Sequence, residues 1–277
     1  MSEVRRALAD AAARLTASDT PRLDAELLLA HALGTTRERL LLDPGAFKAS
    51  QDFETLVERR AAGEPLAYLT GSRAFWTVEL VAGPGVLIPR ADSETLIEAA
   101  VEHFGASEPR TVLDLGTGPG TLLLAALDQW REATGLGVDA SPVALAYAER
   151  NARSLDLAAR TRFVRGGWAG TGERFDLILC NPPYVAEDEP LGPGVREYEP
   201  AQALFAGSDG LDDYRRIAPL LPAQLVPGGV ACVEVGWCQA EAAGALFRAA
   251  GFSVTVRRDL GGRDRCLVLT HGELMVP

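Results

Sequence analysis

The residues most able to do chemistry lie in a short segment in which two prolines separate an asparagine from a tyrosine. The segment, Asn181–Tyr184, follows the apolar run Phe175–Cys180, which has the composition of a buried strand. Pro182 and Pro183 each restrict φ to about −65°, so the backbone has little freedom here. The side-chain carbonyl of Asn181 and the backbone carbonyl of Pro182 can then point at one donor. Because a planar –NH2 group has two N–H bonds, two acceptors can orient it and direct its lone pair toward an electrophile.

The tyrosine at the end of this segment could hold a flat substrate. Tyr184 offers an aromatic face for stacking. A general base is not required if the proton leaves after the new bond has formed, because orientation then supplies the rate enhancement. An Asn-Pro pair is also common in polar turns, so the segment alone favours neither interpretation. We therefore predict Asn181, Pro182 and Tyr184 as catalytic residues on condition that a second site lies beside them.

A glycine-rich loop is that second candidate site. It comprises Asp114–Gly120 and begins within apolar residues that are typical of a strand, Val112–Leu115. In open α/β sheets ligands bind at the carboxyl ends of the strands, where glycines let the backbone approach and a helix N-terminus favours an anion. Asp139 ends the next strand, and its carboxylate can accept hydrogen bonds from two ribose hydroxyls. The predicted cofactor contacts are Gly116, Thr117, Gly118, Pro119, Gly120 and Asp139.

The spacing of these glycines discriminates among cofactors. They stand at 116, 118 and 120, which gives G-x-G-x-G, whereas the dinucleotide fingerprint is G-x-G-x-x-G. The spacing resembles the S-adenosylmethionine loop of class I methyltransferases, in which the helix N-terminus meets a methionine carboxylate. A nicotinamide or flavin site, and a tight turn without a ligand, are less favoured. Together with Asn181–Tyr184, the loop predicts methyl transfer from S-adenosylmethionine to a planar nitrogen.

Both candidate sites lie where strands alternate with helices, which predicts a mostly parallel sheet with helices on both faces. The predicted strands cover 112–115, 135–139, 161–165, 175–180, 229–235, 252–257 and 266–270, and the predicted helices cover 122–130, 142–157, 212–225 and 239–250. No helix fits between the last two strands, so the seven-stranded sheet should end in an antiparallel hairpin. This α/β arrangement is a Rossmann-like class I methyltransferase fold, in which the two candidate sites meet at one sheet edge.

The N-terminal third of the chain has a different pattern. Helical spacing predicts helices at about residues 4–15, 20–33 and 52–60, none with a paired polar constellation. Residues 67–90 are strand-like, and Gly83–Gly85 within them predicts a hairpin or a bent ribbon. A helix over 92–104 follows, with Asp92 or Ser93 as its cap. We therefore predict a small helical N-terminal domain over residues 1–65, a β-hairpin linker over 66–92 and a methyltransferase domain over 93–277.

The composition limits the classes of partner. The net charge is −11, and residues 1–90 carry 11 Lys or Arg against 12 Asp or Glu, so the acidic excess lies in the remainder. Because proteins that follow a phosphate backbone carry a basic stripe, we expect no extended nucleic-acid contact. The four cysteines lack C-x-x-C spacing and a companion His, which predicts buried thiols and no metal. No signal peptide or bilayer-long apolar run is recognised, so we expect a cytoplasmic protein with no membrane partner, acting as a monomer.

With both motifs in place, the chain resembles the HemK-type release factor glutamine methyltransferases over nearly its whole length. The matching segments are, in order, Gly71–Trp76, Val86–Arg90, Asp92–Glu94, Asp114–Gly120, Asn181–Tyr184, Arg196–Pro200, Ala203–Leu204, Gly210–Leu211, Gly236–Trp237 and Asp259–Asp264. Asn-Pro-Pro-Tyr alone also occurs in methyltransferases that act on adenine and guanine, so the other segments narrow the choice. The resemblance implies transfer to the side-chain amide nitrogen (N5) of the glutamine in the Gly-Gly-Gln motif of peptide chain release factors.

The resemblance also implies roles for individual residues. Trp168 and Asn181 would join the cofactor contacts, Asn181–Tyr184 would receive the glutamine, and the N-terminal helices would dock the release factor. Two positions depart from the family pattern. Ala91 stands where proline is usual, which puts the rigidity of that segment in doubt, and Gly167 stands where aspartate is usual, which puts an acidic partner for the adenine amine in doubt.

Three alternatives stay open from the sequence. The acceptor could be a glutamine of a ribosomal protein, or a nucleic-acid base amine, which the acidic balance opposes. The chain could also be a non-catalytic assembly factor that retains the fold, which the intact Asp114–Gly120 and Asn181–Tyr184 motifs oppose. Glu234 ends a predicted strand and could either face the pocket or cap a neighbouring segment.

Overall fold

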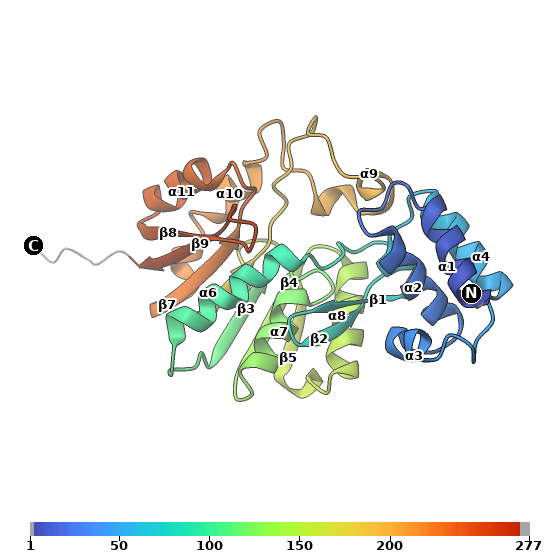
Figure 1. Cartoon of the computed structure of the whole chain (residues 1–277). Coiled ribbons are helices and arrows are strands. Elements are labelled where there is room, and N and C mark those ends of the chain that lie inside the picture. Colours follow the sequence, from blue (N-terminus) through green and yellow to red (C-terminus); the bar gives the residue numbers. More distant parts are fainter. Residues whose placement is uncertain (1–2, 272–277) are drawn as a thin grey trace, which may run out of the picture. The chain divides into compact units, whose positions relative to one another are not determined.

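The structure, a computed structural model, describes residues 3–271 and divides the chain into two compact units. One unit comprises Met1–Ser72 with Leu191–Glu199, and the other comprises Arg73–Pro190 with Pro200–Pro277. The first is helical and the second is built on a seven-stranded sheet (Figure 1). Within residues 3–271 no helix combines the length and the apolar character needed to cross a bilayer.

The helical unit packs short helices around an apolar core. Its elements are α1 (Glu3–Arg14), α2 (Pro21–Ala32), α3 (Arg37–Leu42), α4 (Gln51–Ala61), α5 (Leu66–Thr70) and α9 (Val195–Tyr198). The three helices expected here are confirmed as α1, α2 and α4, and their apolar stripes meet in one cluster that includes Leu8, Leu28 and Phe53. The strand-like pattern predicted to begin at residue 67 is wrong at its start. Helix α5 occupies that stretch, between Pro65 at its N-cap and Gly71, which has φ 79° and ends it.

The seven strands predicted from the sequence are all present in the sheet unit. Its strands are β3 (Thr111–Leu115), β4 (Thr134–Asp139), β5 (Thr161–Arg165), β6 (Phe175–Cys180), β7 (Leu225–Glu234), β8 (Phe252–Arg258) and β9 (Asp264–His271). They lie in the order β5-β4-β3-β6-β7-β9-β8, in which β3 to β7 are parallel and β9 is antiparallel to both neighbours. The fold class and the closing antiparallel hairpin are therefore confirmed.

Helices cover both faces of this sheet, as the alternation predicts. Two helices, α6 (Glu94–Phe104) and α7 (Thr121–Gln129), bury their apolar sides in the cluster on one face. The cluster on the other face takes residues of α10 (Asp212–Ile217) and α11 (Ala240–Ala249). A further helix, α8 (Pro142–Ser154), packs beside β4 and β5. The single helix predicted over 212–225 is wrong, because Pro222 cannot continue an α-helix and lies in the separate 3-10 turn η4 (Leu221–Ala223).

The hairpin before the large sheet turns earlier than predicted. Its strands are β1 (Ser72–Phe75) and β2 (Val78–Val81), so the turn lies at Trp76 and Thr77 and not at Gly83–Gly85. Trp76 has φ 52°, and its backbone N–H donates to Glu94 Oε1 at 2.8 Å, which holds this unusual conformation. Residues 86–88 form no strand, and they line the cavity described next.

Candidate functional site

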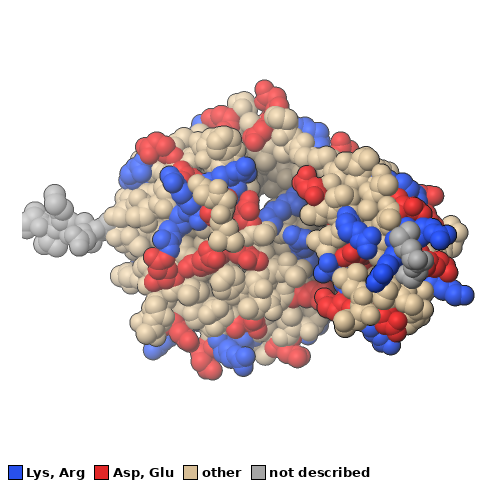
Figure 2. Space-filling model, in the orientation of Figure 1, with Lys and Arg blue, Asp and Glu red and all other residues tan. Residues whose placement is uncertain are grey.

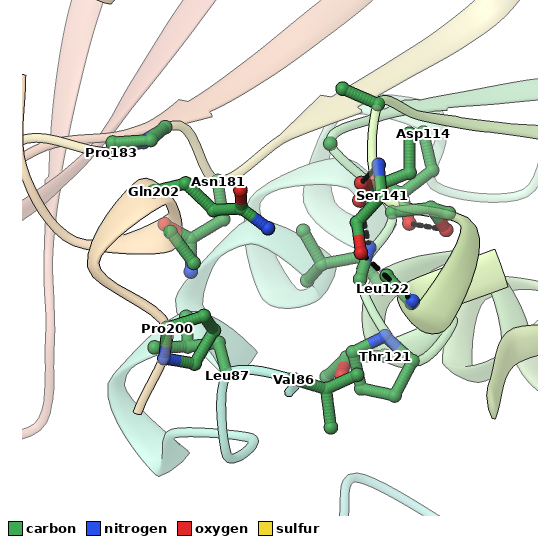
Figure 3. Close-up of a pocket in the computed structure, with 18 of the residues that line it drawn as sticks. Val86, Leu87, Asp114, Thr121, Leu122, Ser141, Asn181, Pro183, Pro200 and Gln202 are labelled. Carbon is green, nitrogen blue, oxygen red and sulfur yellow. Dashed lines mark hydrogen bonds between the residues drawn. The ribbon is translucent and has the colours of Figure 1, made fainter. Parts of the chain in front are cut away.

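The carboxyl ends of β3, β4 and β6 meet at a cavity of about 260 Å³ in the sheet unit. Its lining comes from residues 85–90, Ser93, Asp114, residues 116–119, Thr121, Leu122, residues 138–141, Ala144, residues 166–168, Asn181, Pro183, Pro200, Gln202 and Ala203. Figure 3 shows Asn181 and Gln202 on one side of this cavity and Asp114, Thr121 and Ser141 on the other. The two candidate sites read from the sequence thus share one cavity.

The predicted residues do not all line it. Gly116, Thr117, Gly118, Pro119, Asp139, Trp168, Asn181 and Pro183 do, whereas Gly120, Pro182 and Tyr184 lie outside the lining. Gly120 is the left-handed N-cap of α7, with φ 87°, so it shapes the loop from behind. Pro182 is buried, and Tyr184 packs against the apolar cluster on the α10–α11 face. The roles assigned to these residues stay predictions.

Gly116 brings the glycine loop close to an aromatic wall. Its φ of 73° lies in the left-handed region, and its backbone N–H donates to Val138 O at 2.8 Å. A Cβ placed on this glycine would lie 3.2 Å from the ring of Trp168. Any side chain here would therefore have to displace the indole or occupy the space in front of it. The backbone at this position is accessible only because the residue is glycine.

Asp139 holds the loop from the end of β4. Its Oδ2 accepts a hydrogen bond from the backbone N–H of Gly118, and its Oδ1 accepts one from Ser141, each at 2.8 Å. Each carboxylate oxygen keeps further acceptor capacity, so the side chain can still bind two hydroxyls. Ser141 also caps α8 by accepting from the N–H of Ala144 at 3.2 Å. The carboxylate is thus fixed in place before any ligand binds.

Asp114 lies beneath the same loop and is almost completely buried. Its Oδ2 accepts from Thr117 Oγ1 at 2.7 Å and from the N–H of Leu123 at 3.1 Å, while Oδ1 has no partner among the described residues. Burial raises the pKa of the Asp114 carboxyl to about 7, since no cation offsets the loss of water and Asp139 adds a like charge. Asp114 therefore supports the loop and binds a proton more tightly than an ordinary aspartate does.

Trp168 is held in place by polar partners on the α10 side. Its Nε1–H donates to Asp213 Oδ1 at 3.0 Å, and its carbonyl accepts from Gln224 Nε2 at 2.9 Å. Asp213 also accepts from Arg216 Nη1 at 3.1 Å. Gly167 lines the cavity but has no side chain, so no acidic group is present at that position. A Cβ placed there would have no neighbour within 4 Å. The sequence departure at Gly167 therefore leaves this part of the wall without a carboxylate.

The Asn-Pro-Pro-Tyr segment is anchored at both ends. Asn181 Nδ2 donates to Ser93 Oγ at 3.2 Å, and Tyr184 OH donates to Glu234 Oε1 at 3.1 Å. Burial, with the nearby charge of Glu234, raises the pKa of the Tyr184 phenol, so it stays protonated as a donor. Burial likewise raises the pKa of the Glu234 carboxyl. From the sequence, Glu234 either faces the pocket or caps a neighbouring segment; it is absent from the cavity lining and instead accepts from Tyr184, so the structure does not support the first interpretation.

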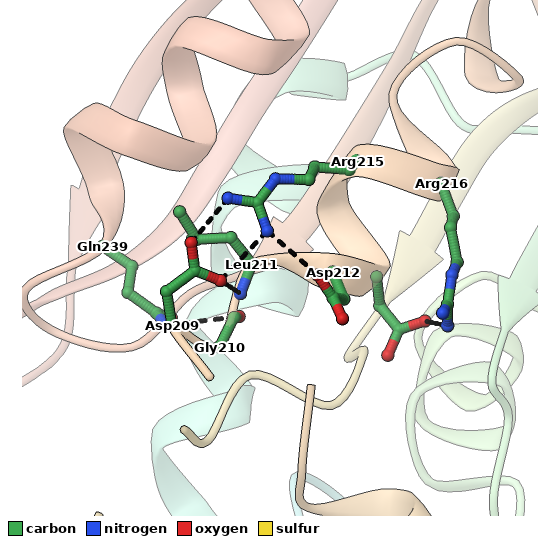
Figure 4. A network of polar contacts seen from close by, with 8 residues as sticks. Asp209, Gly210, Leu211, Asp212, Arg215, Arg216 and Gln239 are labelled. Carbon is green, nitrogen blue, oxygen red and sulfur yellow. Dashed lines mark hydrogen bonds and ion pairs between the residues drawn. The ribbon is translucent and has the colours of Figure 1, made fainter. Parts of the chain in front are cut away.

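A second set of contacts fixes the backbone that follows Tyr184. The carbonyl of Tyr184 accepts from Gln239 Nε2 at 2.8 Å. The same amide nitrogen donates to Gly210 O at 3.4 Å, as Figure 4 shows. Gly210 has φ 70°, and a Cβ there would collide with the Tyr184 carbonyl oxygen. The loop that carries Gly210 is closed by two hydrogen bonds between Asp209 and Arg215, at 3.0 and 2.5 Å, which lower the pKa of Asp209 to about 2.

Sequence reasoning missed several lining residues. The sequence predicts Ser93 as a possible helix cap, yet its side chain accepts from no helix N–H and instead accepts from Asn181 Nδ2. Gln202 also lines the cavity and carries no local motif that predicts it, whereas residues 86–88 belong to a segment that matches the family but were predicted as a strand. Within the described part of the chain, no cluster of three or more His, Cys, Asp or Glu side chains could hold a metal ion.

Comparison with known proteins agrees with this geometry. The family described as PrmC N-terminal domain matches residues 6–71, and the Methyltransferase small domain family matches residues 90–193. A release factor glutamine methyltransferase of Caulobacter vibrioides is 40% identical over 94% of this chain and 92% of its own. One of Cereibacter sphaeroides is 44% identical over 94% of this chain and 95% of its own. The chain belongs to the release factor glutamine methyltransferase family.

Membership in this family identifies the chain as a methyltransferase with S-adenosylmethionine as its methyl donor, and both predictions are confirmed. A methyltransferase structure from Pyrococcus furiosus matches with a TM-score of 0.52 at 16% identity, over 70% of this chain and 88% of that one, which supports the fold. The residues present suit this cofactor. Asp139 has acceptor capacity left, and the space that a side chain at Gly116 would fill faces the flat ring of Trp168.

Proposed function

We propose that this enzyme methylates the side-chain amide nitrogen (N5) of the glutamine in the Gly-Gly-Gln motif of peptide chain release factors. The observation that carries the proposal is that Asn181 and Pro183 line the same cavity as the glycine loop and Asp139. Full-length relatives named for release factor glutamine methylation support the choice of substrate. The glutamine amide is the planar –NH2 group for which the Asn181–Tyr184 segment has the matching acceptors.

The residues of the cavity divide into two groups by role. The residues proposed to hold the cofactor are Gly116–Gly120, Asp139 and Trp168, of which all but Gly120 line the cavity. Asp139 accepts from the ribose hydroxyls, and Trp168 lies against the adenine. S-adenosylmethionine supplies an electrophilic methyl group. Asn181 Oδ1 and the carbonyl of Pro182 accept the two amide protons of the glutamine, which directs the nitrogen lone pair into the cavity. Pro183 and Tyr184 shape the segment that receives the glutamine.

The mechanism relies on orientation and needs no side chain to remove a proton first. Asn181 Nδ2 is already committed to Ser93, and Oδ1 accepts no hydrogen bond from the described residues, so the acceptor end is available to substrate. Two acceptors that hold both N–H bonds direct the nitrogen lone pair toward the methyl group and favour a geometry of the amide in which conjugation is weakened. The proton is lost to solvent after transfer.

The helical unit is proposed to dock the release factor. None of its residues lines the cavity described above, and the PrmC N-terminal domain family matches most of this unit. Residues Leu191–Glu199 group with this unit, so the docking part is not limited to the N-terminal 65 residues. We further propose that the enzyme acts as a monomer in the cytoplasm, with release factors as its partners.

Charge on the surface agrees with a protein substrate. On the face shown in Figure 2, Lys and Arg are interspersed with Asp and Glu and form no continuous basic stripe. The net charge of −11 acts in the same direction, because extended binding to a phosphate backbone depends on clustered cations.

Mass spectrometry of an intact release factor after incubation with enzyme and S-adenosylmethionine tests the proposal. We expect one added methyl group, located on the Gly-Gly-Gln glutamine. A release factor with this glutamine replaced by alanine should gain none. Parallel incubations with ribosomal proteins and with RNA should give no product. Methylation of either of these, with the release factor unmodified, would contradict the proposed substrate.

A further inference from the structure

The Asn-Pro-Pro-Tyr segment is rich in hydrogen-bond acceptors and poor in donors. Its two prolines, Pro182 and Pro183, have no backbone N–H. Its side-chain donors are directed at other parts of the chain, since Asn181 Nδ2 donates to Ser93 Oγ at 3.2 Å and Tyr184 OH donates to a buried carboxylate at 3.1 Å. The groups that this segment has left for a ligand are therefore acceptors.

A glutamine amide needs a donor in addition to two acceptors. Its –NH2 group has two N–H bonds to give, and its carbonyl oxygen accepts hydrogen bonds. In the proposed function, Asn181 Oδ1 and the carbonyl of Pro182 hold the –NH2 group, and neither can pair with the carbonyl oxygen. A carbonyl that loses water without gaining a donor weakens binding. The complete site therefore needs a donor that comes from outside this segment.

Gln202 carries a side-chain amide at the same cavity. Within the described residues two side-chain amides line the cavity, those of Asn181 and Gln202. Gln202 lies in the 3-10 turn η3 (Ala201–Ala203), and Figure 3 shows it on the same side of the cavity as Asn181. Its side chain is exposed, and its carboxamide forms no hydrogen bond with any residue from 3 to 271. Gln202 can therefore offer its –NH2 group to a ligand.

Backbone pairing holds η3 against the residue that follows the Asn-Pro-Pro-Tyr segment. The N–H of Val185 donates to Leu204 O, and the N–H of Ala206 donates to Val185 O, each at 2.9 Å. Leu204 and Ala206 are buried, so this part of the backbone is fixed while the side chain of Gln202 stays accessible. The amide on η3 is thus carried by a backbone that is anchored to the end of the proposed substrate-binding segment.

Other polar side chains of the cavity are committed elsewhere or lie across from the segment. The hydroxyl of Thr117 and the indole N–H of Trp168 already donate within the chain, at 2.7 and 3.0 Å. Thr121 and Ser141 lie across the cavity from Asn181 in Figure 3. The amide on η3 is therefore an uncommitted donor on the side that receives the glutamine.

We propose that Gln202 Nε2 donates to the carbonyl oxygen of the substrate glutamine. This inference rests on the proposed glutamine methylation and deepens it, because it names the group that completes the hydrogen bonds of the target amide. The oxygen of a neutral amide is more nucleophilic than its nitrogen, so a donor that holds the oxygen also keeps it away from the methyl group. Gln202 is thus a substrate contact that orients the amide with its nitrogen toward the cofactor.

Two substitutions in the full-length enzyme separate loss of the donor from reversal of its polarity. Gln202→Ala removes the amide and should lower the single-turnover rate on a release factor about tenfold at saturating cofactor and release factor. Gln202→Glu keeps the length of the side chain but places an acceptor against the substrate carbonyl, so it should be slower than Gln202→Ala. A wild-type rate for Gln202→Ala, or a Gln202→Glu enzyme faster than Gln202→Ala, would overturn the proposal.

Ala201 provides matched controls, because it is exposed in the same 3-10 turn and lies outside the cavity lining. Ala201→Glu adds the same charge one residue away and should keep the wild-type rate. Ala201→Gln combined with Gln202→Ala returns an amide to the turn but not to the cavity, so the rate should stay at that of Gln202→Ala. Equal slowing by Ala201→Glu and Gln202→Glu, or a restored rate in the double variant, would contradict a donor placed at Gln202.

Cofactor binding and stability separate this substrate contact from other roles. Gln202 has no hydrogen bond to lose within the described residues, so the thermal unfolding temperature and the affinity for S-adenosylhomocysteine should match wild type in both Gln202 variants. A fall in that affinity as large as the fall in rate would assign Gln202 to the cofactor and overturn the proposal.

The same assays distinguish failure of this inference from failure of the proposed function. If wild-type enzyme leaves release factors unmethylated, the proposed function is wrong and the inference falls with it. If wild type and Gln202→Ala methylate the release factor at the same rate, only the inference is wrong.

Discussion

Buried carboxylates in the two units have opposite surroundings. In the helical unit, Asp24 and Glu26 are both nearly inaccessible and each is bonded to arginine. Asp24 meets Arg60 Nε at 2.8 Å, and Glu26 meets Arg22 and Arg37 at 2.7 and 2.8 Å. In the sheet unit, Asp114 and Glu234 are buried at least as deeply. Neither forms an ion pair within the described residues, and each has one oxygen without a well-formed partner.

The difference separates structural charge from functional charge. A buried carboxylate paired with arginine has its charge compensated, and removal of the arginine would leave that charge buried and unpaired. A buried carboxylate without a cation costs stability, and such groups persist in proteins mainly at functional sites. Asp114 supports the glycine loop and Glu234 supports the Asn-Pro-Pro-Tyr segment. In the sheet unit, the two buried carboxylates that each have one unpaired oxygen lie beneath the glycine loop and beside the Asn-Pro-Pro-Tyr segment. Asp24 and Glu26 in the helical unit are instead paired with arginine.

The largest effect that would sharpen this comparison is the pH dependence of stability due to Asp114. Its carboxyl ionises near 3.8 in an unfolded chain and at about 7 in the folded protein. The folded state therefore holds the proton more tightly, so the free energy of unfolding should fall as pH rises from about 4 to 7 and level off above. The full span corresponds to about 4 kcal/mol.

Asp114→Asn should flatten this profile, because the amide does not titrate. Denaturant unfolding of wild type and variant at several pH values between 4 and 8 measures both slopes. Identical slopes in the two proteins would show that Asp114 is not the group that titrates.

The matching change in the helical unit is Arg60→Ala. It leaves Asp24 buried without its arginine, although Ser18 and Thr20 still donate to it. Loss of one member of a buried ion pair costs about 3 kcal/mol. Denaturation should register this loss, while calorimetry shows S-adenosylhomocysteine affinity equal to wild type. Affinity that falls together with stability would contradict the division of roles between the two units.

A smaller effect concerns Asp139. Asp139→Ala removes the acceptor for the ribose hydroxyls and frees the N–H groups of Gly118 and Ser141, so cofactor affinity should fall by about 1–3 kcal/mol. Calorimetry with S-adenosylhomocysteine measures the change. Glu173→Ala, which removes an exposed carboxylate paired with Arg162, is the control and should bind as wild type does. Unchanged affinity in Asp139→Ala would remove this residue from the cofactor site.

The sequence predicts the fold well where a local pattern carries the signal. Apolar runs followed by a turn locate β3 and β6, and Ser141-Pro142 locates the start of α8. The hairpin turn was misplaced because Gly83–Gly85 has the stronger turn composition, whereas Trp76 adopts a positive φ only with the help of Glu94 from a later helix. Such a tertiary contact leaves no mark in the local sequence.

The same limit applies to the site. The residues of Asp114–Gly120 and Asn181–Tyr184 follow from short motifs whose spacing implies a ligand or a turn. Ser93 and Gln202 reach the cavity from segments about 88 residues before and 20 residues after Asn181, through loops without a motif. Glu234 is predictable as a strand-end residue but its partner is not, since Tyr184 follows β6, a neighbouring strand whose register the sequence leaves unspecified.

The central claim is that Asn181 orients the target amide, and single-turnover methylation of a release factor with saturating cofactor tests it most directly. Asn181→Ala removes one of two acceptors and should slow transfer about 100-fold, while Pro182 and Pro183 still shape the loop. Asn181→Asp should not restore the rate, because a carboxylate stabilises the positively charged cofactor before transfer more than after it. Because Asn181 is also an expected cofactor contact, S-adenosylhomocysteine affinity is measured in parallel and the rates are compared at saturating cofactor. Rates within about threefold of wild type for both would contradict the claim.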